Sequence, residues 1–591
     1  MSNRFTYLVA ILLLTIMFTA SLTSLWQESA TKYEPVHITA GYSYLTQKDY
    51  RLNLEHPPLA KDISAIPLLT MDLNFPKSSP LWEKGTNNEW ALSTDFLYNS
   101  GNYADEIIFW SRIPMLLMLL FLGGFIFSWA RELAGNKAAL IALFLFSFSP
   151  SFLAHGKLST LDTAAALGAV IASYFWIKFL KKINWQNATI AGVTLGIALL
   201  FKFSLVILLP FFIITTLIFS CLKYNRNRSI VAAKGISKYL ILSLFSFLVA
   251  IFLVIWPVYQ LHLLDHPLEK QILDTKEISG TLPDSILNKI PQKAVNNSLL
   301  RPLGHYLLGS LMIAQDSDGS MIYFLGKVST QTPWYYFPVI YFLKIPLAFH
   351  LITIITAIWL SSLVKNPFSK DRRKKLNKWT KSHFAELVMI LFILVYWLIS
   401  IVGKINIGIR HLLPTLPFLY ILLSIGLSKL LDSKKEKKWI ALLVFVLITW
   451  YISSSLFSWP NYISYYNEAA GGTENGYKYA VNSNYDWGQD LKRLQEWMDT
   501  NKIQSCYLDY FGGGKPEYYL GTKYKRWYGI KSGEDFPKGN YLVVSATLLQ
   551  RGKGTPKENL LLTENYQWLK DSYLIPKRAA CCDSLFIYFI E

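Results

Sequence analysis

The sequence is poor in cysteine and has fewer acidic than basic residues. Only four of its 591 residues are cysteine, and no cysteine or histidine is spaced as a metal site requires. Cys221 stands apart, whereas Cys506, Cys581 and Cys582 fall in the C-terminal part of the chain, where three candidates leave any disulfide pairing open. The 39 Asp and Glu against 58 Lys and Arg give a net charge of +19, which must be mapped before it suggests a partner.

Internal repeats, low-complexity segments and a signal-peptide cleavage site are also missing. Residues 7–22 form an uncharged apolar run, and no small-x-small site follows it, so we interpret it as a retained membrane anchor. The chain shows no division into two inverted halves, a pattern found in many transporters.

Long apolar runs are abundant, and the sequence is 52% hydrophobic. A helix needs about 20 apolar residues to cross a bilayer. The sequence therefore predicts an α-helical polytopic membrane protein with about 11 transmembrane helices. The predicted spans are 7–22, 112–130, 138–154, 163–179, 188–201, 204–222, 239–257, 335–362, 385–402, 412–430 and 439–457.

The charges are distributed unevenly between the loops. Residues 365–381 carry eight basic residues against one acid, 223–238 carry five against none, and 433–438 are also basic, whereas 26–110 hold eleven acids against six bases. Short basic loops stay in the cytoplasm. We predict a multi-pass plasma-membrane protein with a cytoplasmic N-terminus and with 26–110, 258–334, 403–411 and the tail outside. The positive charge then reports topology, and no nucleic-acid partner is expected.

The tail has the pattern of a folded domain. Residues 541–546 and 585–590 are typical of strands, and 491–498 form an amphipathic helical pattern. We predict a small α/β extracytoplasmic C-terminal domain over 460–591, following a transmembrane domain over 1–459 that carries the outer loops 26–110 and 258–334. No folded insert is apparent in the loop 258–334.

Ionisable residues gather at the outer ends of the predicted spans and in the loops beside them. Taken singly, each has an ordinary explanation: Lys202, in the turn 201–204, could be an amine reaching the interface, and Asp162 a first-turn helix acid. Together on one face, they indicate a functional site. The set is Glu34, His37, Glu55, His56, Lys61, His155, Lys157, Asp162, Lys202, Arg410 and His411.

Four stretches carry a family resemblance: EPVHITAGYSYLTQKDYRLNLEHPPLAK at 34–61, TPWYYFPVIYFLKIPLAF at 332–349, INIGIRHLLPTLPF at 405–418 and YYNEAAGGTENGYKYAVNSNYDWGQDL at 465–491. They resemble the dolichyl-phosphate-mannose protein mannosyltransferase superfamily (glycosyltransferase family 39-like), and most closely its prokaryotic phospholipid carrier-dependent glycosyltransferase branch. The resemblance implies a GT-C fold and an enzyme that moves a sugar from a polyprenyl-phosphate carrier to an acceptor on the outer face.

The resemblance also implies roles for individual residues. Glu34 and Asp162 would be the catalytic carboxylates, although Tyr33 stands where the family usually has Asp. By similarity to lipid A aminoarabinose transferases, Glu55 would hold a divalent metal ion or orient the donor; no tight cluster of His, Cys and Asp dictates a metal. The donor and its phosphate would be bound by Glu55, His56, Lys61, Lys202, Arg410 and His411.

Two motifs can each be interpreted in two ways. Pro57 and Pro58 would present Glu55 and His56 from a stiff backbone, or would simply begin an interfacial helix with Lys61 facing headgroups. The motif NSNYDWGQDL at 482–491, in the tail, would line the acceptor or sugar pocket together with His37, or would form a turn and the N-cap of the helix at 491–498. Its residues are Asp486, Trp487, Gln489 and Asp490.

Rival functions remain at this point. One is protein O-mannosyltransfer specifically; another is a transporter or lipid-translocating protein; a third is a non-catalytic relative, which Tyr33 favours. A transporter does not easily explain why ionisable groups cluster at the outer face while the span centres hold few polar residues. The expected partners are a polyprenyl-phosphate-linked sugar, the bilayer, and an acceptor protein or glycan.

Overall fold

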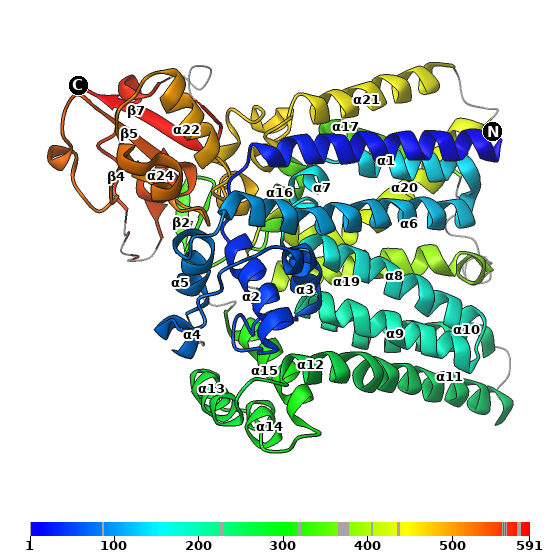
Figure 1. Ribbon diagram of the computed structural model, residues 1–591. Helices are drawn as coiled ribbons and strands as arrows, with labels where there is room; N and C mark the ends of the chain where they lie inside the picture. Colours follow the sequence, from blue (N-terminus) through cyan, green and yellow to red (C-terminus); the bar gives the residue numbers. More distant parts are fainter. Residues whose placement is uncertain are drawn as a thin grey trace.

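The computed structural model describes residues 2–591 apart from 85–87, 225–229, 317–320, 364–377, 404–405, 434–437, 558–559, 561, 563 and 576–580. Most of the basic run at 365–381, parts of those at 223–238 and 433–438, and two residues of the turn at 403–411 lie outside the described residues. A bundle of long helices ends at one side in short helices, loops and a sheet-containing C-terminal region (Figure 1).

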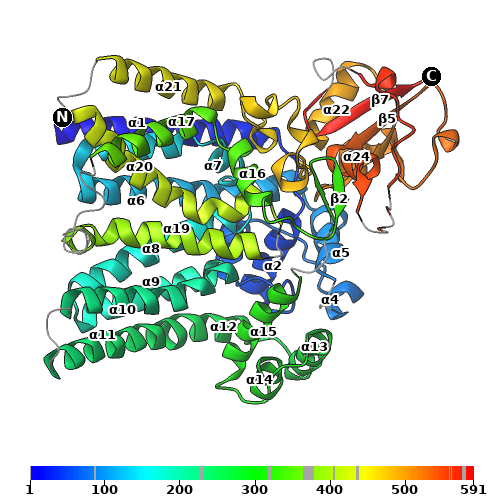
Figure 2. The same ribbon diagram turned by 180° about the vertical axis from the view of Figure 1, so that it is seen from behind.

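Eight helices in the described ranges are long and apolar enough to span a membrane, and a ninth span is possible if α16 and α17, bent by 104°, count as one (Figure 2). A multi-pass membrane protein is thereby confirmed. The segments are α1 (Asn3–Trp26), α6 (Ala104–Ser147), α8 (Asp162–Lys181), η3 (Phe203–Ile207) with α10 (Leu208–Tyr224), α11 (Ile230–Leu248) with η4 (Val249–Ile255) and α12 (Trp256–His262), α16 (Tyr336–Lys344) with α17 (Leu347–Ser362), α19 (Phe384–Val402), η5 (Ile409–Thr415) with α20 (Leu416–Asp432), and α21 (Lys438–Leu456).

Helix α6 contains the predicted span 112–130 and the larger part of the predicted span 138–154. Its backbone is non-helical at Ala134 and at Gly135, where φ is +79°. A Cβ added to Gly123 would lie 3.0 Å from the Phe146 ring, whereas 23 residues of straight helix would separate the two by about 35 Å. The chain therefore reverses at Gly135. The count by length gives nine spans when the bent pair is included. Counting the two arms of α6 separately and adding the 17-residue apolar α9 (Trp185–Phe201) raises it to the eleven predicted spans.

The short helices lie at one end of the bundle, opposite the N-terminus (Figure 1). The loop 258–334, in which no folded insert was apparent, contains three helices and a hairpin, because short amphipathic segments give no long apolar run. The first loop contributes α2 (Glu34–Gln47), α3 (Leu59–Ala65), η1 (Ile66–Thr70), α4 (Pro80–Lys84), α5 (Glu89–Thr94) and η2 (Asp95–Asn99), and α7 (Pro150–His155) precedes α8. The loop 258–334 contributes α13 (Leu268–Thr281), α14 (Ile286–Ala294), α15 (Arg301–Asp316), β1 (Ile322–Phe324) and β2 (Lys327–Ser329).

The C-terminal region contains the predicted strands and helix. The strands β5 (Asn540–Ser545) and β7 (Leu585–Ile590) pair antiparallel in a sheet of order β4-β3-β5-β7, in which β3 runs parallel to both β4 and β5. A second sheet joins the tail to the loop 258–334, because β6 pairs with β2. The other elements are α22 (Leu491–Thr500), β3 (Cys506–Asp509), α23 (Pro516–Leu520), β4 (Tyr524–Arg526), α24 (Ala546–Lys553) and β6 (Thr555–Pro556).

The cysteines and the domain boundary complete the comparison with the sequence. Cys581 and Cys582 form a disulfide, whereas Cys506 is free and buried. The boundary at 459/460 stays a prediction, because one hydrophobic cluster includes Tyr323 and Leu343 together with residues of the tail.

Close backbone contact fixes α3 on α2. A Cβ added to Gly41 of α2 would lie 2.2 Å from the Lys61 carbonyl oxygen of α3, a distance that only glycine avoids. The contact sets the position of the segment 53–61, which carries His56. The packing of α3 on α2 therefore affects where the His56 side chain lies.

We expect Gly41→Ala to force α3 away and to cost about 1–3 kcal/mol, as overpacking of a close contact usually does. The apparent unfolding temperature of the purified protein would fall. Gly124→Ala is the matched control, since nothing lies within 4 Å of a Cβ there, and alanine is the better helix former by about 1 kcal/mol. Equal unfolding temperatures for the two variants would contradict the prediction.

Candidate active site

A buried ion pair lies where α1, α2 and α6 meet. Arg112 donates from Nε to Glu34 Oε1 at 2.8 Å and from Nη2 to Oε2 at 2.6 Å. Thr31 donates its N–H and hydroxyl to Oε2, at 2.8 and 3.0 Å, and the Ser159 N–H donates to Oε1 at 2.9 Å. Arg112 also donates to the carbonyl of Ser29, beyond the end of α1. The pair thus joins three segments far apart in sequence.

These contacts change the role expected for Glu34. Burial alone raises the pKa of its carboxyl, but Arg112 and the hydrogen bonds from Thr31 and Ser159 outweigh it and hold the pKa below its usual value. Five donors occupy the two oxygens, so no lone pair is left for an acceptor hydroxyl. A role as general base, one form of the catalytic role that the resemblance implies for Glu34, does not fit this geometry.

Asp162 is the second predicted carboxylate, and it holds two cations. Lys202 Nζ donates to its Oδ1 at 2.6 Å, and Arg410 Nη1 lies 3.4 Å from its Oδ2. These residues come from the first turn of α8, the turn between α9 and η3, and η5. The cluster has two positive charges against one negative charge. Within the described ranges Lys202 makes this one hydrogen bond, so it retains N–H groups that can bind an anion.

Lys61 is buried and serves its own loop. Its Nζ donates to the carbonyls of Asn53 and His56, at 2.9 and 2.8 Å, and to the Tyr44 hydroxyl at 2.9 Å. Burial lowers its pKa to about 7, against the pull of Asp62 and Glu55. Neither headgroup contact nor a free phosphate-binding amine fits these bonds. Lys61 instead holds the segment that presents His56.

Aromatic and imidazole rings form a continuous wall beside the Asp162 cluster. Tyr33 lies 6.1 Å from His37 and 6.0 Å from Trp487, centroid to centroid, and His37 lies 5.6 Å from His56. The Arg410 guanidinium carbon stands 4.6 Å from the Trp487 ring centroid. His411 lies beyond this wall, between Phe337 and Tyr396.

Many buried polar atoms of this region have no hydrogen-bond partner among the described residues. Native proteins satisfy nearly all such atoms, so a concentration of exceptions in the segments that meet at Asp162 indicates a place for a polar ligand. The atoms are His37 Nε2, His56 Nδ1, His155 Nδ1, His411 Nδ1, Trp487 Nε1, Ser159 Oγ, Thr160 Oγ1 and Thr163 Oγ1.

Of the tail motif, only Trp487 faces this site. Asp486 accepts the Thr547 N–H at 2.8 Å, Gln489 bonds to the backbone of Trp487 and Tyr485, and Asp490 accepts from Ser584. Asp490 directly precedes α22 but makes no capping hydrogen bond. These three residues fasten the tail, which holds the Trp487 ring in place.

Glu55 is partly exposed, and the Asn53 side-chain amide donates to it at 3.4 Å. No group of three or more His, Cys, Asp or Glu side chains able to hold a metal ion occurs in the part of the chain that the structure describes. The residues around Glu55 therefore do not fit the divalent metal expected from the resemblance.

The sequence analysis missed Arg112 and the part played by Tyr33, and it included Lys157 in the set of ionisable residues without a role. Lys157 is fully buried and donates to Glu28 Oε1 at 2.8 Å and to Ser24 Oγ at 2.7 Å, which ties the 155–162 segment to α1. A signal for Arg112 was present: it is the basic residue at the start of an otherwise apolar run.

Comparisons with known proteins agree with the family suggested by the motifs. Residues 104–256, about a quarter of the chain, match the model of the dolichyl-phosphate-mannose-protein mannosyltransferase family. This segment contains none of the four stretches that carry the resemblance, so the match is additional to them. A search of curated proteins finds no match.

Two solved structures are distantly similar. The apo oligosaccharyltransferase of Archaeoglobus fulgidus is 11% identical, over 93% of this chain and 71% of that one, with a TM-score of 0.45. ArnT of Cupriavidus metallidurans in the apo state is 12% identical, over 92% of this chain and 94% of that one, with a TM-score of 0.28. Both likenesses are too distant to establish a shared fold.

We expect Arg112→Met to destabilise the protein strongly, by about 3–5 kcal/mol, because it leaves the Glu34 carboxylate buried without its partner. The control is Lys137→Met, which removes the exposed pair with Asp432 and should change stability by less than about 1 kcal/mol. Thermal unfolding of the purified variants measures both. A similar small effect of the two changes would disprove the weight given to the buried pair.

The Asp486 carboxyl gives a pH dependence. Burial raises its pKa to about 7, against the hydrogen bonds from Thr547. The folded protein keeps this proton where the unfolded chain has lost it, so the stability contribution of Asp486 falls as pH rises from about 4 to about 7. The amount by which the unfolding temperature of Asp486→Asn exceeds that of wild type should be larger near pH 8 than near pH 4. Asp432→Asn, at an exposed site, should show no such difference.

Proposed function

We propose that this protein is a membrane glycosyltransferase of GT-C type that transfers a sugar from a polyprenyl-phosphate carrier to an acceptor on the outer face of the membrane. The observation that carries the proposal is the buried cluster of Asp162, Lys202 and Arg410 at the span ends, near buried polar atoms that have no hydrogen-bond partner in the part of the chain that the structure describes. The family match supports it, because residues 104–256 include Asp162 and Lys202.

The two cations suit a phosphate leaving group. Arg410 and Lys202 lie at the ends of spans, the depth at which the phosphate of a membrane-embedded carrier sits. A phosphate entering here would be stabilised by preorganised donors as its negative charge develops. Asp162 keeps the two cations together before the donor arrives. Lys61 takes no part in this contact.

We assign the general base to His37. Its Nδ1 lies 3.2 Å from the Ser159 carbonyl oxygen, which can only accept, so Nδ1 carries the proton. Burial, and the nearby charge of Lys61, lower the pKa of His37 to about 3, so the ring is neutral. Nε2 then presents a lone pair that has no hydrogen-bond partner among the described residues. A bound phosphate would offset the neighbouring cations and raise the basicity of the ring.

The reaction follows from these positions. The acceptor hydroxyl oxygen attacks the anomeric carbon and gives its proton to His37 Nε2, while the bond from that carbon to the phosphate oxygen breaks. The electron pair leaves with the polyprenyl phosphate, whose charge meets Lys202 and Arg410. Glu34 and Arg112 hold the segment that orients His37. No step in this sequence requires a metal ion.

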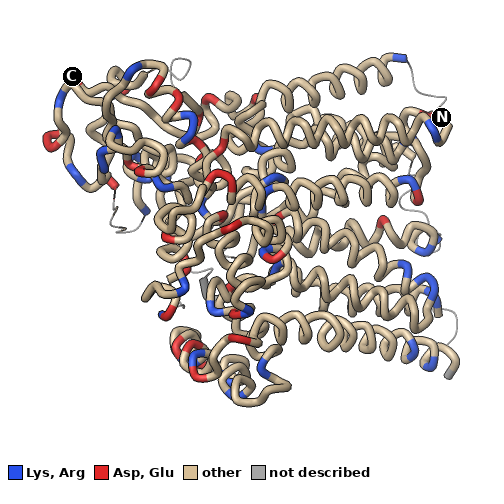
Figure 3. Tube along the Cα trace, in the orientation of Figure 1, with Lys and Arg blue, Asp and Glu red and all other residues tan. Residues whose placement is uncertain are grey.

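The charge distribution supports the proposed orientation. The end of the bundle that carries the N-terminus holds Lys and Arg with few acids, whereas most Asp and Glu lie at the other end and in the C-terminal region, mixed with further Lys and Arg (Figure 3). By the bias of basic residues towards the cytoplasm, we place the N-terminus inside, the site and tail outside, and the chain in the plasma membrane. A 1–459 transmembrane domain and a 460–591 outer domain form part of this proposal.

The test is release of polyprenyl phosphate from labelled polyprenyl-phosphate mannose, glucose and aminoarabinose by the purified protein in liposomes. His37→Gln should lower turnover by about 100-fold or more, the usual contribution of a general base, while donor binding is retained. The control is His383→Gln, just before α19, where the ring bonds to Ser382 and Trp379 and to none of the site residues; it should behave as wild type.

Other outcomes identify the rival functions. Donor binding without release by wild type would indicate a non-catalytic relative, and movement of intact donor across the bilayer would indicate a transporter. Transfer only to Ser or Thr of a polypeptide would narrow the proposal to protein O-mannosylation.

A further inference from the structure

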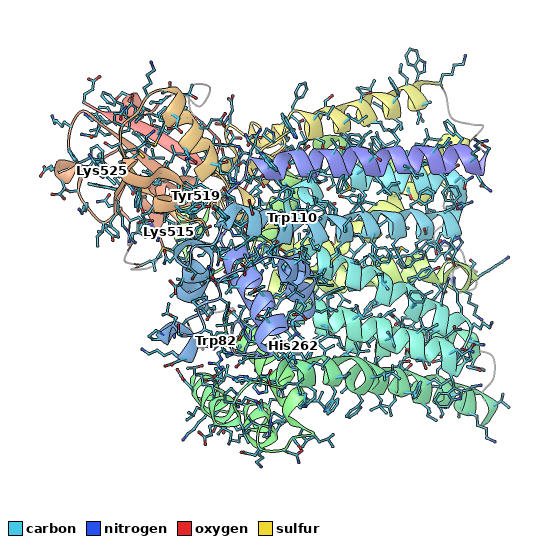
Figure 4. All side chains as sticks on the ribbon, in the orientation of Figure 1. Trp82, Trp110, His262, Lys515, Tyr519 and Lys525 are labelled. Atoms are coloured by element: carbon cyan, nitrogen blue, oxygen red, sulfur yellow. A yellow bond between two sulfur atoms is a disulfide. The ribbon has the colours of Figure 1, made fainter. Side chains whose placement is uncertain are left out.

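A cleft of about 380 Å³ lies between the first loop and the C-terminal sheet. Its walls include Trp90 of α5 and the residues that follow β3 and β4, among them Tyr510 and Tyr528. These are the carboxyl ends of two parallel strands, where ligands commonly bind in open sheets. Lys515, another lining residue, marks this side of the C-terminal region in Figure 4 and donates to Asn99 Oδ1.

Aromatic rings form much of the lining. Trp90 is 40% exposed and Tyr528 is 47% exposed, although neither lies in a membrane-spanning segment. Tyr510, Tyr524 and Trp527 also line the cleft. Such rings combine an apolar face with a polar edge, which suits the alternating C–H and hydroxyl surfaces of a sugar. The volume suffices for a small oligosaccharide, being at the lower end of the range for ligand pockets.

The polar lining carries both signs of charge. Asp509 and Glu517 supply carboxylates, and Lys32 and Arg526 supply cations. Hydroxyl groups both donate and accept, so they can bond to each kind of side chain. A purely cationic lining would instead suit a phosphate, and a purely apolar one a lipid tail. The mixture favours a neutral polyhydroxylated ligand.

The cleft opens towards the candidate active site. Trp90 lies 5.3 Å from Tyr33, centroid to centroid, and Lys32 directly precedes Tyr33. Lys32 Nζ stands 4.4 Å from the Phe511 ring centroid, at the border of the two regions. The donor phosphate is placed at the span ends, beside Lys202. The cleft lies on the other side of Tyr33, where a substrate from the aqueous phase would enter.

We propose that this cleft binds a carbohydrate, and that the acceptor of the transfer reaction is a glycan rather than a polypeptide. The second part rests on the proposed function; the first does not. Tyr528 and Trp90 provide the stacking faces, and Glu517 bonds to sugar hydroxyls. The terminal sugar of the acceptor then extends past Trp90 to Tyr33 and His37.

Saturation-transfer NMR on the full-length protein in detergent tests the binding. The probes are maltotriose, mannotriose and N,N′-diacetylchitobiose, with a Ser/Thr-containing hexapeptide as competitor. We expect at least one glycan to receive saturation and Tyr528→Ala to raise its Kd at least tenfold. Glu517→Gln should weaken it less. Tyr518→Ala is the matched control: Tyr518 is 38% exposed but packs on Tyr98 outside the cleft, so its Kd should equal wild type.

Three results would overturn the inference: no saturation of any glycan, an unchanged Kd for Tyr528→Ala, or displacement of the glycan by the hexapeptide. Donor breakdown is measured separately and should be the same in wild type and Tyr518→Ala, whose changed side chain lies outside the cleft. If no donor is broken down but glycan binding still depends on Tyr528, the cleft stands as a sugar site and the transferase proposal fails. If donor is broken down and glycan binding is absent, the transferase proposal stands and the cleft is not a sugar site.

Discussion

The buried pair between Glu34 and Arg112 is the constraint on which the site depends. Both side chains are removed from water, which is tolerable only when every hydrogen bond is made. Making them requires the end of α1, the start of α2, the body of α6 and the segment before α8 to meet in one arrangement. His37 lies one turn after Glu34 on α2, and Asp162 lies three residues after Ser159. The ion pair therefore fixes both.

Charge is then divided between neighbouring regions of the site. Two cations share one carboxylate at the span ends, while the imidazoles beside them are kept neutral by burial. An anionic group completes the first region, and a hydroxyl group suits the second. Beyond Tyr33, farther from the membrane-spanning segments, the lining of the cleft carries both signs of charge, which favours a neutral ligand. The kind of ligand that suits each region thus changes from charged to neutral with distance from the membrane-spanning segments.

The sequence predicts the elements of this fold better than their contacts. Apolar runs near 20 residues place the spans, and short runs of β-branched and aromatic residues place β5 and β7, because both signals are local. Glu34 and Arg112 are 78 residues apart, and no pattern in either segment shows that they pair. The fully bonded state of Glu34 could not be predicted for the same reason. The sequence suggested that Lys61 binds the donor phosphate. Its burial depends on the close contact with Gly41, 20 positions earlier, which the local sequence around Lys61 does not show.

The tail contributes to the site through its backbone as well as through Trp487. The Trp487 carbonyl accepts the Lys32 N–H at 2.9 Å, and the Asn484 side-chain oxygen accepts the Ile409 N–H at 3.0 Å. Both partners are synthesised long before the tail. The order of synthesis therefore leaves the segments at Lys32 and Ile409 without these two bonds until the chain has passed Trp487. A chain that ends before Asn484 lacks both bonds, and it also lacks the Trp487 ring that lies beside Arg410.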